Sequence, residues 1–167
     1  MLDIQQIQSE FDRMFSHQSQ EKINSYYGPI QDDTIATAEN LIQLTFPLSY
    51  RLFLRRFGVA NFGSYDIHGL IYADGEDEFS FQDVAERTYQ LRNTIDYNFV
   101  EEDKIISISN DQDGVRFYLD LNYYKDGEAP VVAISGYFGP TVVAKNFLEF
   151  LQVVVKSLEV DNPFNMY

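Results

Sequence analysis

The segment 35–63 constrains the fold of this chain more than any other. Apolar residues recur at three- and four-residue intervals over 35–42 and again over 50–57, which predicts two short helices that each bury one face. Pro47 separates them, because it disfavours the α region at the preceding residue and suits the first position of the next helix. Gly58 then marks the end of the second helix.

This segment resembles the signature of the SUKH superfamily, in which a helix with Ile and Glu is followed by a Leu-Pro step, a Tyr, a Phe-Leu pair and a glycine-bearing turn. The matching residues are Ile35, Glu39, Pro47, Tyr50, Phe53, Leu54, Gly58 and Gly63. Phe46 stands where leucine is usual, and 58–63 replaces the common double glycine. The resemblance extends over about 35–158. It implies a non-enzymatic binding domain, most often a bacterial immunity protein that blocks a toxin domain, or alternatively a regulatory interaction module of the cell-wall-regulator type.

Further helices are predicted on either side of this segment. Residues 2–17 and 147–158 each carry an apolar stripe at helical spacing, and a helix over 81–93 is predicted with Ser80 as its cap. Asp32 or Asp33 is expected to cap the helix that begins the signature. The first helix is expected to pack on the core, since its polar face lacks the basic cluster that membrane-surface helices use.

The centre of the chain is predicted to form strands. Residues 104–109, 115–120 and 130–135 are rich in β-branched and aromatic side chains, and turn residues join them, which predicts an antiparallel meander. Short alternating runs over 61–72 suggest edge strands. Helices around a strand-rich centre predict a single α+β domain over 1–167, with helices packed on one face of a largely antiparallel sheet, as the SUKH resemblance also implies.

Charge restricts the possible partners. Twenty-six acidic against twelve basic residues give a net charge of −14, which repels nucleic acid and anionic membranes and attracts cationic proteins. The resemblance adds a specific expectation: a cognate toxin domain, such as a nuclease, with a basic surface. The alternative is that the acidic surface only keeps the protein soluble. Absence of cysteine, of an apparent signal peptide and of a long apolar run predicts a cytoplasmic protein.

Acidic residues cluster in loops, and together they could line one edge of the sheet as a partner-binding patch, although each cluster alone could be ordinary solvated loop charge. The candidate residues are Asp74, Glu76, Asp77, Glu78, Glu101, Glu102, Asp111, Asp113, Asp126 and Glu128. Exposed tyrosines would supply anchors, with the pairs Tyr26-Tyr27 and Tyr123-Tyr124 as candidates. Tyr50 is expected in the core.

No catalytic or metal-binding motif is found. The chain has no cysteine, its only histidines are His17 and His68, and it lacks the nucleophile-elbow, phosphate-loop and zinc-helix motifs. Residues 109–120 superficially resemble a calcium loop, but Ser109 and Asp120 occupy the first and twelfth positions, where the motif needs Asp and Glu. We therefore predict no catalytic residue, no metal and no cofactor, while a hydrolase using unrecognised carboxylates stays open.

Overall fold

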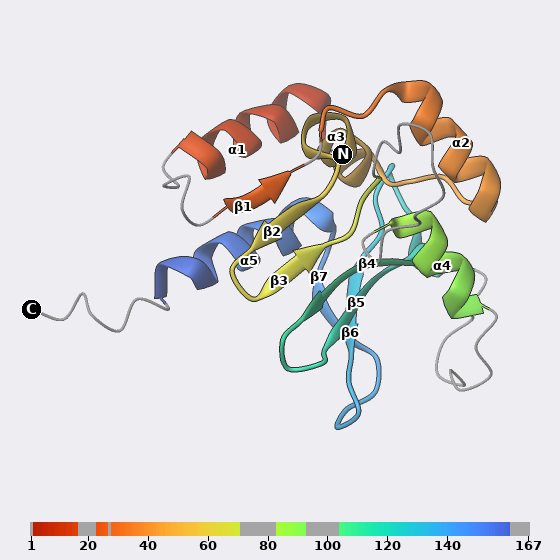
Figure 1. Cartoon of the computed structure of the whole chain (residues 1–167), viewed down its shortest axis with the longest axis vertical. Coiled ribbons are helices and arrows are strands. Elements are labelled where there is room, and N and C mark those ends of the chain that lie inside the picture. The colour runs from red at the N-terminus through yellow and green to blue at the C-terminus, as the bar shows by residue number, and fades with distance from the viewer. Residues whose placement is uncertain (1, 17–22, 27, 71–82, 93–103, 161–167) are drawn as a thin grey trace, which may run out of the picture.

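The computed structural model describes residues 2–16, 23–26, 28–70, 83–92 and 104–160 (Figure 1). Its helices are α1 (Ile4–Ser16), α2 (Asp32–Ile42), α3 (Leu48–Phe57), α4 (Val84–Arg92) and α5 (Phe147–Val160), with a 3₁₀ helix η2 (Leu121–Tyr123). Its strands are β1 (Ile23–Tyr26), β2 (Ala60–Phe62), β3 (Tyr65–Ile67), β4 (Ile105–Asp111), β5 (Arg116–Asp120), β6 (Val131–Ile134) and β7 (Thr141–Ala144).

These strands form one antiparallel sheet in which each strand pairs with the next along the chain, from β1 to β7. The predicted α+β class with a largely antiparallel sheet is confirmed. The predicted meander is β4, β5 and β6, and Ile106 of β4 lies opposite Leu119 of β5. Strands β1 and β7 were not expected: each is short, and neither lies in a longer run of β-branched and aromatic residues such as the one over 130–135 that predicted β6.

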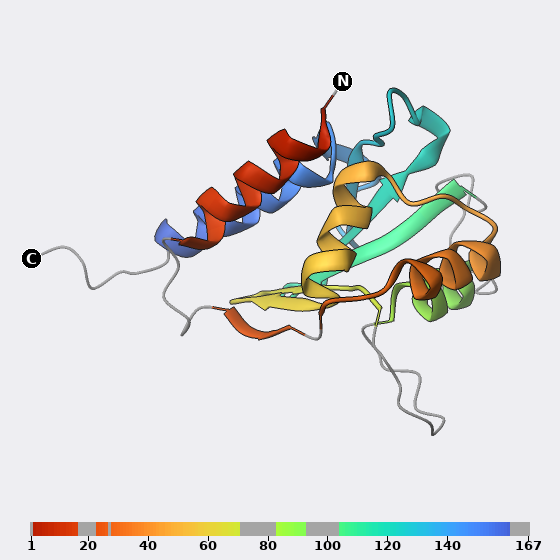
Figure 2. The same ribbon diagram turned by 90° about the horizontal axis from the view of Figure 1, so that it is seen from above.

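The main core lies between one face of the sheet and the helices α1, α3 and α5. Ile106 and Ile108 of β4 and Phe117 and Leu119 of β5 are buried in it. In this helical layer α1 and α5 lie side by side, as Figure 2 shows. The predicted stripe of α5 closes the core as expected, with Phe147, Phe150, Leu151, Val154, Val155 and Leu158 all buried. This layer supplies most of the buried apolar surface that stabilises the fold.

Helix α4 lies against the opposite face of the sheet. Successive side chains of a strand point to opposite faces, and Tyr118, between Phe117 and Leu119, packs with Leu91 of α4 in a second, smaller cluster. Ile105, Val132 and Ile134 complete that cluster. The main helical layer therefore covers one face, and α4 adds a small layer on the other.

The signature residues hold α2 and α3 together. Glu39 Oε1 accepts a hydrogen bond from the Phe46 backbone N–H at 2.8 Å, and its Oε2 lies 2.9 Å from Arg51 Nη2. Tyr50 is fully buried, as expected, packs edge-on against Phe46, and donates its hydroxyl proton to the backbone oxygen of His68 at 2.7 Å. These contacts make the signature a scaffold for the helix pair.

Two signature glycines end elements where a side chain would be strained. Gly58 has φ 69° and its N–H donates to the Leu54 oxygen at 3.0 Å, which ends α3 as predicted. Gly63 has φ 60° in the turn between β2 and β3. A Cβ at Gly63 would also lie 2.6 Å from Leu158 Cδ2 of α5, so glycine lets the turn approach that helix.

Helix starts differ from the predictions at α2 and α3. Gln31 is the N-cap residue of α2, whereas Asp32 and Asp33, the expected caps, lie within its first turn. There Asp32 accepts both hydrogen bonds of an ion pair with Arg55 of α3, at 2.6 and 2.8 Å. Pro47 precedes α3 as its N-cap residue instead of occupying the first helical position. The acidic residues still favour the helix, because they lie near its positive end.

Helix α4 is also shorter than the predicted 81–93. It begins at Val84, and Asp83 Oδ1 accepts from the backbone N–H groups of Ala85 and Glu86, each at 2.9 Å. The expected cap, Ser80, lies outside the described residues. The buried residues of α4 are Val84, Ala85, Thr88 and Leu91, whereas Tyr89 is 54% exposed.

Candidate partner-binding surface

Two turns project from the same end of the sheet. Residues 112–115, which follow Asp111 at the end of β4, connect β4 to β5, and residues 135–140 connect β6 to β7. Arg116, at the start of β5, pairs with both Asn110 and Ile134, so the two turns are neighbours, as Figure 1 shows. We call this pair of turns the turn end of the sheet.

The turn 135–140 presents two aromatic side chains. Tyr137 is 97% exposed and Phe138 is 44% exposed. The Oγ of Ser135 accepts from the backbone N–H groups of Tyr137 and Phe138, at 3.1 and 3.3 Å, so the turn is held by local hydrogen bonds. Exposed aromatic side chains on an ordered turn are the kind of group that anchors protein interfaces.

Strand β7 continues this apolar surface. It is the last strand in the order of the described sheet. Val142 and Val143 are 64% and 43% exposed, and the register with β6 shifts between Val131 and Val132, which explains how two successive valines both remain accessible. An apolar edge strand of this kind favours association with another chain.

The structure separates the acidic candidates that it describes. Asp111 and Asp113 lie at the turn end, whereas Asp126 and Glu128 lie at the opposite end of β5, beyond Asp120 (Figure 1). Asp113 is exposed, while Asp111 Oδ1 accepts from the N–H groups of Asp113 and Val115 and so shapes the turn. These four carboxylates therefore do not form one patch. Asp74, Glu76, Asp77, Glu78, Glu101 and Glu102 lie outside the described residues.

Glu128 has a structural contact at the start of α3. Its Oε1 accepts from the backbone N–H of Ser49 at 2.9 Å, and its Oε2 accepts from the Ser49 hydroxyl at 2.7 Å. Burial raises the pKa of Glu128, while these hydrogen bonds oppose that rise. The carboxylate thus satisfies N-terminal donors of α3 from a distant turn. Nothing in the sequence near Glu128 signals this contact.

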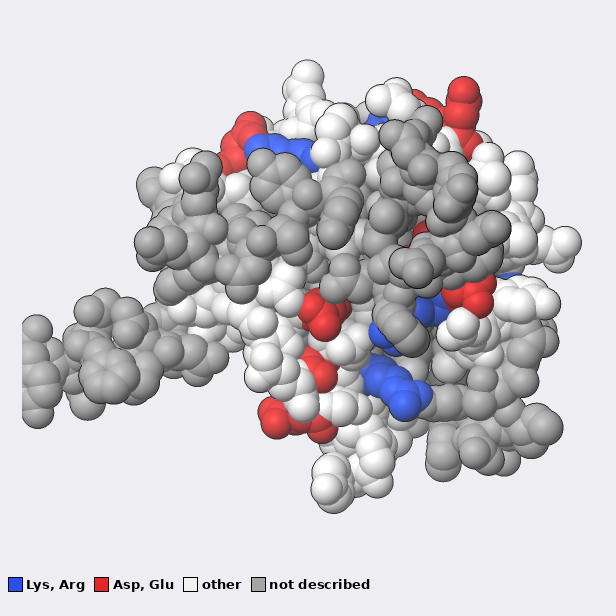
Figure 3. All heavy atoms as spheres, viewed as in Figure 1, with Lys and Arg blue, Asp and Glu red and all other residues white. Residues whose placement is uncertain are grey.

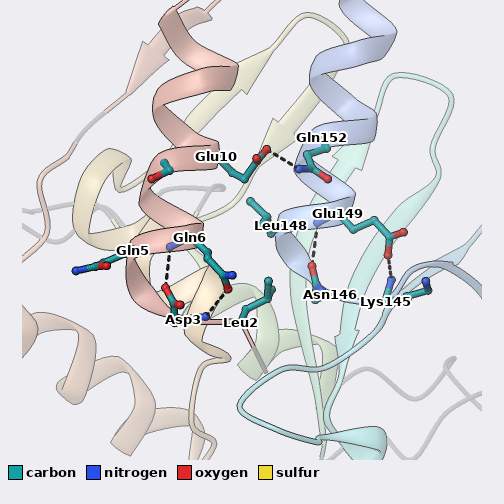
Figure 4. Close-up of a pocket in the computed structure, with 11 residues that line it drawn as sticks. Leu2, Asp3, Gln5, Gln6, Glu10, Lys145, Asn146, Leu148, Glu149 and Gln152 are labelled. Carbon is teal, nitrogen blue, oxygen red and sulfur yellow. Dashed lines mark hydrogen bonds between the residues drawn. The ribbon is translucent and has the colours of Figure 1, made fainter.

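A groove lies between the N-terminal halves of α1 and α5 (Figure 4). Several of its polar groups already have partners within it. Asp3 and Gln6 bond reciprocally, Gln152 donates to Glu10, and Asn146 accepts from Glu149. Because these hydrogen bonds lie within and between α1 and the start of α5, we interpret this groove as a junction between two helices.

Of the two histidines, only His68 lies within the described residues, and it is buried. Its Nε2 lies 2.7 Å from Asn110 Oδ1 and its Nδ1 lies 3.3 Å from the Ser107 backbone oxygen. Burial lowers its pKa to about 4, and the nearby charge of Arg87 adds to that effect. His17 lies outside the described residues. Within the part of the chain that the structure describes, no three His, Asp or Glu side chains could together hold a metal ion.

Across those same residues, no helix has the length and apolar content to cross a bilayer.

The sequence analysis did not predict residues 137–143 as part of a partner-binding surface. A signal was present, since Tyr137 and Phe138 lie between Gly136 and Gly139, a pattern typical of a turn, and Thr141 and two valines follow. What the pattern could not show is that these side chains face solvent. Their exposure depends on which elements pack over the turn and over β7, and that is set by the tertiary structure.

Comparison with known families identifies the matching part of the chain. A model of the family described as SMI1-KNR4 cell-wall, within the SUKH group, matches residues 32–151. No curated protein matches the chain. The matched range runs from the start of α2 into α5 and includes the signature and the turn end.

Proposed function

This chain belongs to the SMI1-KNR4 family of SUKH domains, and from this membership we propose that it is an immunity protein that binds and neutralises a cognate bacterial toxin domain. The family supports a toxin-immunity or regulatory interaction module, so a protein is the expected class of partner. The proposed toxin domain has a basic surface, as a nuclease would. The proposed role is cytoplasmic and requires no catalysis, no cofactor and no contact with nucleic acid or membrane.

The observation that carries this proposal is the composition of the turn end. Tyr137 and Phe138 are exposed on one of its two turns, and Asp113 is exposed on the other. Aromatic side chains supply large contact areas at an interface, and acidic neighbours attract basic ones. Val142 and Val143 extend the apolar surface along the edge of the sheet.

The net charge of the whole chain supports the same choice of partner. A charge of −14 accelerates the approach of a basic domain and slows that of an acidic one, and added salt weakens both effects. Neutralisation is then steric and electrostatic: the turn end covers the toxin domain's substrate surface and occupies its basic side chains. No side chain of the immunity protein has to react.

The decisive experiment is co-expression of this chain with the toxin domain encoded next to it. The wild-type chain should rescue growth and form a complex with that domain. The double variant Tyr137→Ser, Phe138→Ser should lose rescue and weaken binding at least about tenfold, since interface aromatics commonly contribute 1–2 kcal/mol or more each. If the wild-type chain neither rescues growth nor binds, the immunity proposal is wrong.

A matched aromatic pair provides the control. Tyr123 and Tyr124 are 71% and 46% exposed and lie towards the other end of β5. The variant Tyr123→Ser, Tyr124→Ser should keep rescue and affinity. Loss of binding in this variant, with normal binding by the variant at Tyr137 and Phe138, would place the interface at the opposite end of the sheet.

The acidic residues can be tested by association kinetics. Asp113→Asn should slow association at low salt, whereas Asp126→Asn removes the same charge from the opposite end and should change the rate less. Reversing Glu76, Asp77 and Glu78 to lysine tests the acidic candidates that lie outside the described residues in the same way. Unchanged rates at low salt in all these variants would contradict electrostatic recognition.

The family's description supports a second candidate, a regulatory protein-interaction module of the cell-wall-regulator type. Such a module would bind a signalling partner instead of a toxin. Affinity purification followed by mass spectrometry distinguishes the two candidates. A toxin domain encoded beside this gene supports immunity, and a regulatory protein encoded elsewhere supports the second candidate.

A further inference from the structure

The layers that cover the two faces of the sheet end at β6. Val131 and Val132 are successive residues of β6, so they point to opposite faces, and both are buried, at 0% and 4% exposed. Thr141 and Val142 are successive residues of β7 in regular register with β6, so they also point to opposite faces, yet both are exposed. Both faces of β7 are therefore accessible at its start.

The outer edge of β7 is open as well. In the part of the chain that the structure describes, β7 is the last strand of the sheet, and no further strand or isolated bridge pairs with it beyond β6. An edge strand presents backbone N–H and C=O groups that can pair with another strand. Threonine and valine, which make up most of β7, favour strand structure and so suit such pairing.

Charge limits which strand can pair with this edge. The segment 135–144, which comprises the turn before β7 and β7 itself, carries no charged side chain, whereas 23% of the whole chain is charged. In Figure 3 the turn 135–140 is the white projection at the bottom of the view. A charge placed opposite the valines of β7 would lose water and gain no partner. The strand that pairs here should therefore be uncharged, which disfavours a basic strand.

The β7 strand of a second copy meets these requirements. It is uncharged, it has the same length and it has the same open edge. Antiparallel pairing of two identical strands is self-complementary, because a two-fold axis then relates the two copies and each contact is made twice. Thr141, Val142 and Val143 would face the same three residues of the second copy, and cross-strand pairs of β-branched side chains stabilise a sheet.

We propose that this chain forms a dimer in which β7 pairs antiparallel with β7 of a second copy, so that the sheet continues across the two-fold axis. The paired segment is short, since Pro140 has no N–H to donate and the register shift interrupts the ladder at Val143. The net charge of −14 on each copy opposes association. The dimer is therefore weak, and added salt strengthens it, whereas salt weakens the proposed toxin complex.

Sedimentation velocity of the full chain tests the proposal, from about 10 µM to about 1 mM protein, in about 20 mM and about 500 mM NaCl. The dimer fraction should rise with concentration, and the dissociation constant should be at least about threefold lower at the higher salt. A monomer throughout the series at both salt concentrations overturns the proposal. A dimer that weakens as salt is added also overturns it, because charge pairs would then hold the copies together.

A matched pair of variants locates the contact. Val142→Glu places a carboxylate of each copy at the paired strands and should weaken dimerisation at least about tenfold. Val153→Glu adds the same charge on α5, where Val153 is 56% exposed against 64% for Val142, and should change dimerisation less than about twofold. Both positions are exposed, so both variants should fold, which circular dichroism verifies. Equal effects of the two variants would contradict pairing through β7.

Cross-linking offers an independent readout, because the chain contains no cysteine. When a sheet continues across a two-fold axis, one residue of the edge strand lies opposite its own equivalent, and full overlap of β7 places Val142 or Val143 there. Val142→Cys or Val143→Cys should therefore form an intermolecular disulfide on mild oxidation faster than Val153→Cys does. Rates no faster than that control in both variants would exclude the β7 contact.

The toxin domain of the proposed function is the alternative occupant of this edge. If the wild-type chain is monomeric while Val142→Glu loses binding of the toxin domain encoded next to it, the edge belongs to the toxin complex and the proposed dimer is wrong. A dimer that depends on Val142 in a chain that binds no toxin domain supports this inference and contradicts only the proposed function.

Discussion

A substitution at Glu39 tests whether the signature residues stabilise the fold or bind the partner. Its carboxylate accepts from the Phe46 N–H, on a residue only 2% exposed, and pairs with Arg51 in a contact where the Glu39 side chain is 13% exposed. Glu39→Ala leaves that N–H without its acceptor, at about 1–3 kcal/mol. It also removes a partly exposed ion pair, at up to about 1 kcal/mol. We expect a loss of about 1–4 kcal/mol in the free energy of unfolding.

Urea denaturation followed by circular dichroism measures this loss. For a chain of this size, the loss should lower the melting temperature by roughly 2–16 °C. Glu39→Gln should cost less, because its amide oxygen can still accept from Phe46. Asn40→Ala, at an exposed position next along α2, should stay within about 0.5 kcal/mol of wild type. A loss below about 1 kcal/mol for Glu39→Ala, or weaker partner binding by the folded variant, would refute the scaffold role.

Three further changes test other parts of the structure. Phe53→Ala should destabilise the fold by about 3–5 kcal/mol, because the fully buried ring of Phe53 packs on Tyr50 and Phe147. Thermal and urea unfolding measure this loss. A loss below about 1 kcal/mol would contradict the prediction, since it would mean that the core closes over the cavity left by the ring. Stability should fall as the pH drops from about 6.5 towards 4, since the unfolded chain protonates His68 more readily than the fold, whose His68 pKa is about 4. His68→Gln should flatten this dependence in urea titrations at several pH values, and an equally steep curve would exclude His68 as its source. Gly58→Ala should shorten α3 or destabilise it by 1 kcal/mol or more, measured by urea unfolding, because φ is 69° there; wild-type stability would contradict this.

Sequence periodicity was sufficient for elements whose pattern is long. The stripe of α5, the helix pair around Pro47 and the stop at Gly58 all follow from local chemistry, because side-chain spacing and backbone preference act within a few residues. The family could also be predicted from the sequence, because the signature residues lie in one continuous segment.

Only the tertiary structure decided which distant residues meet. Ser49 and Glu128 are 79 residues apart, and their contact depends on how α3 docks against the turn before β6. The place of Val142 and Val143 at the end of the sheet depends on strand order, and the burial of Tyr118 against Leu91 depends on α4 lying over the second face of the sheet. Such contacts arise from packing between elements far apart in sequence. Local pattern therefore determined the elements and the family, while the sheet register and helix docking determined the surface available to a partner.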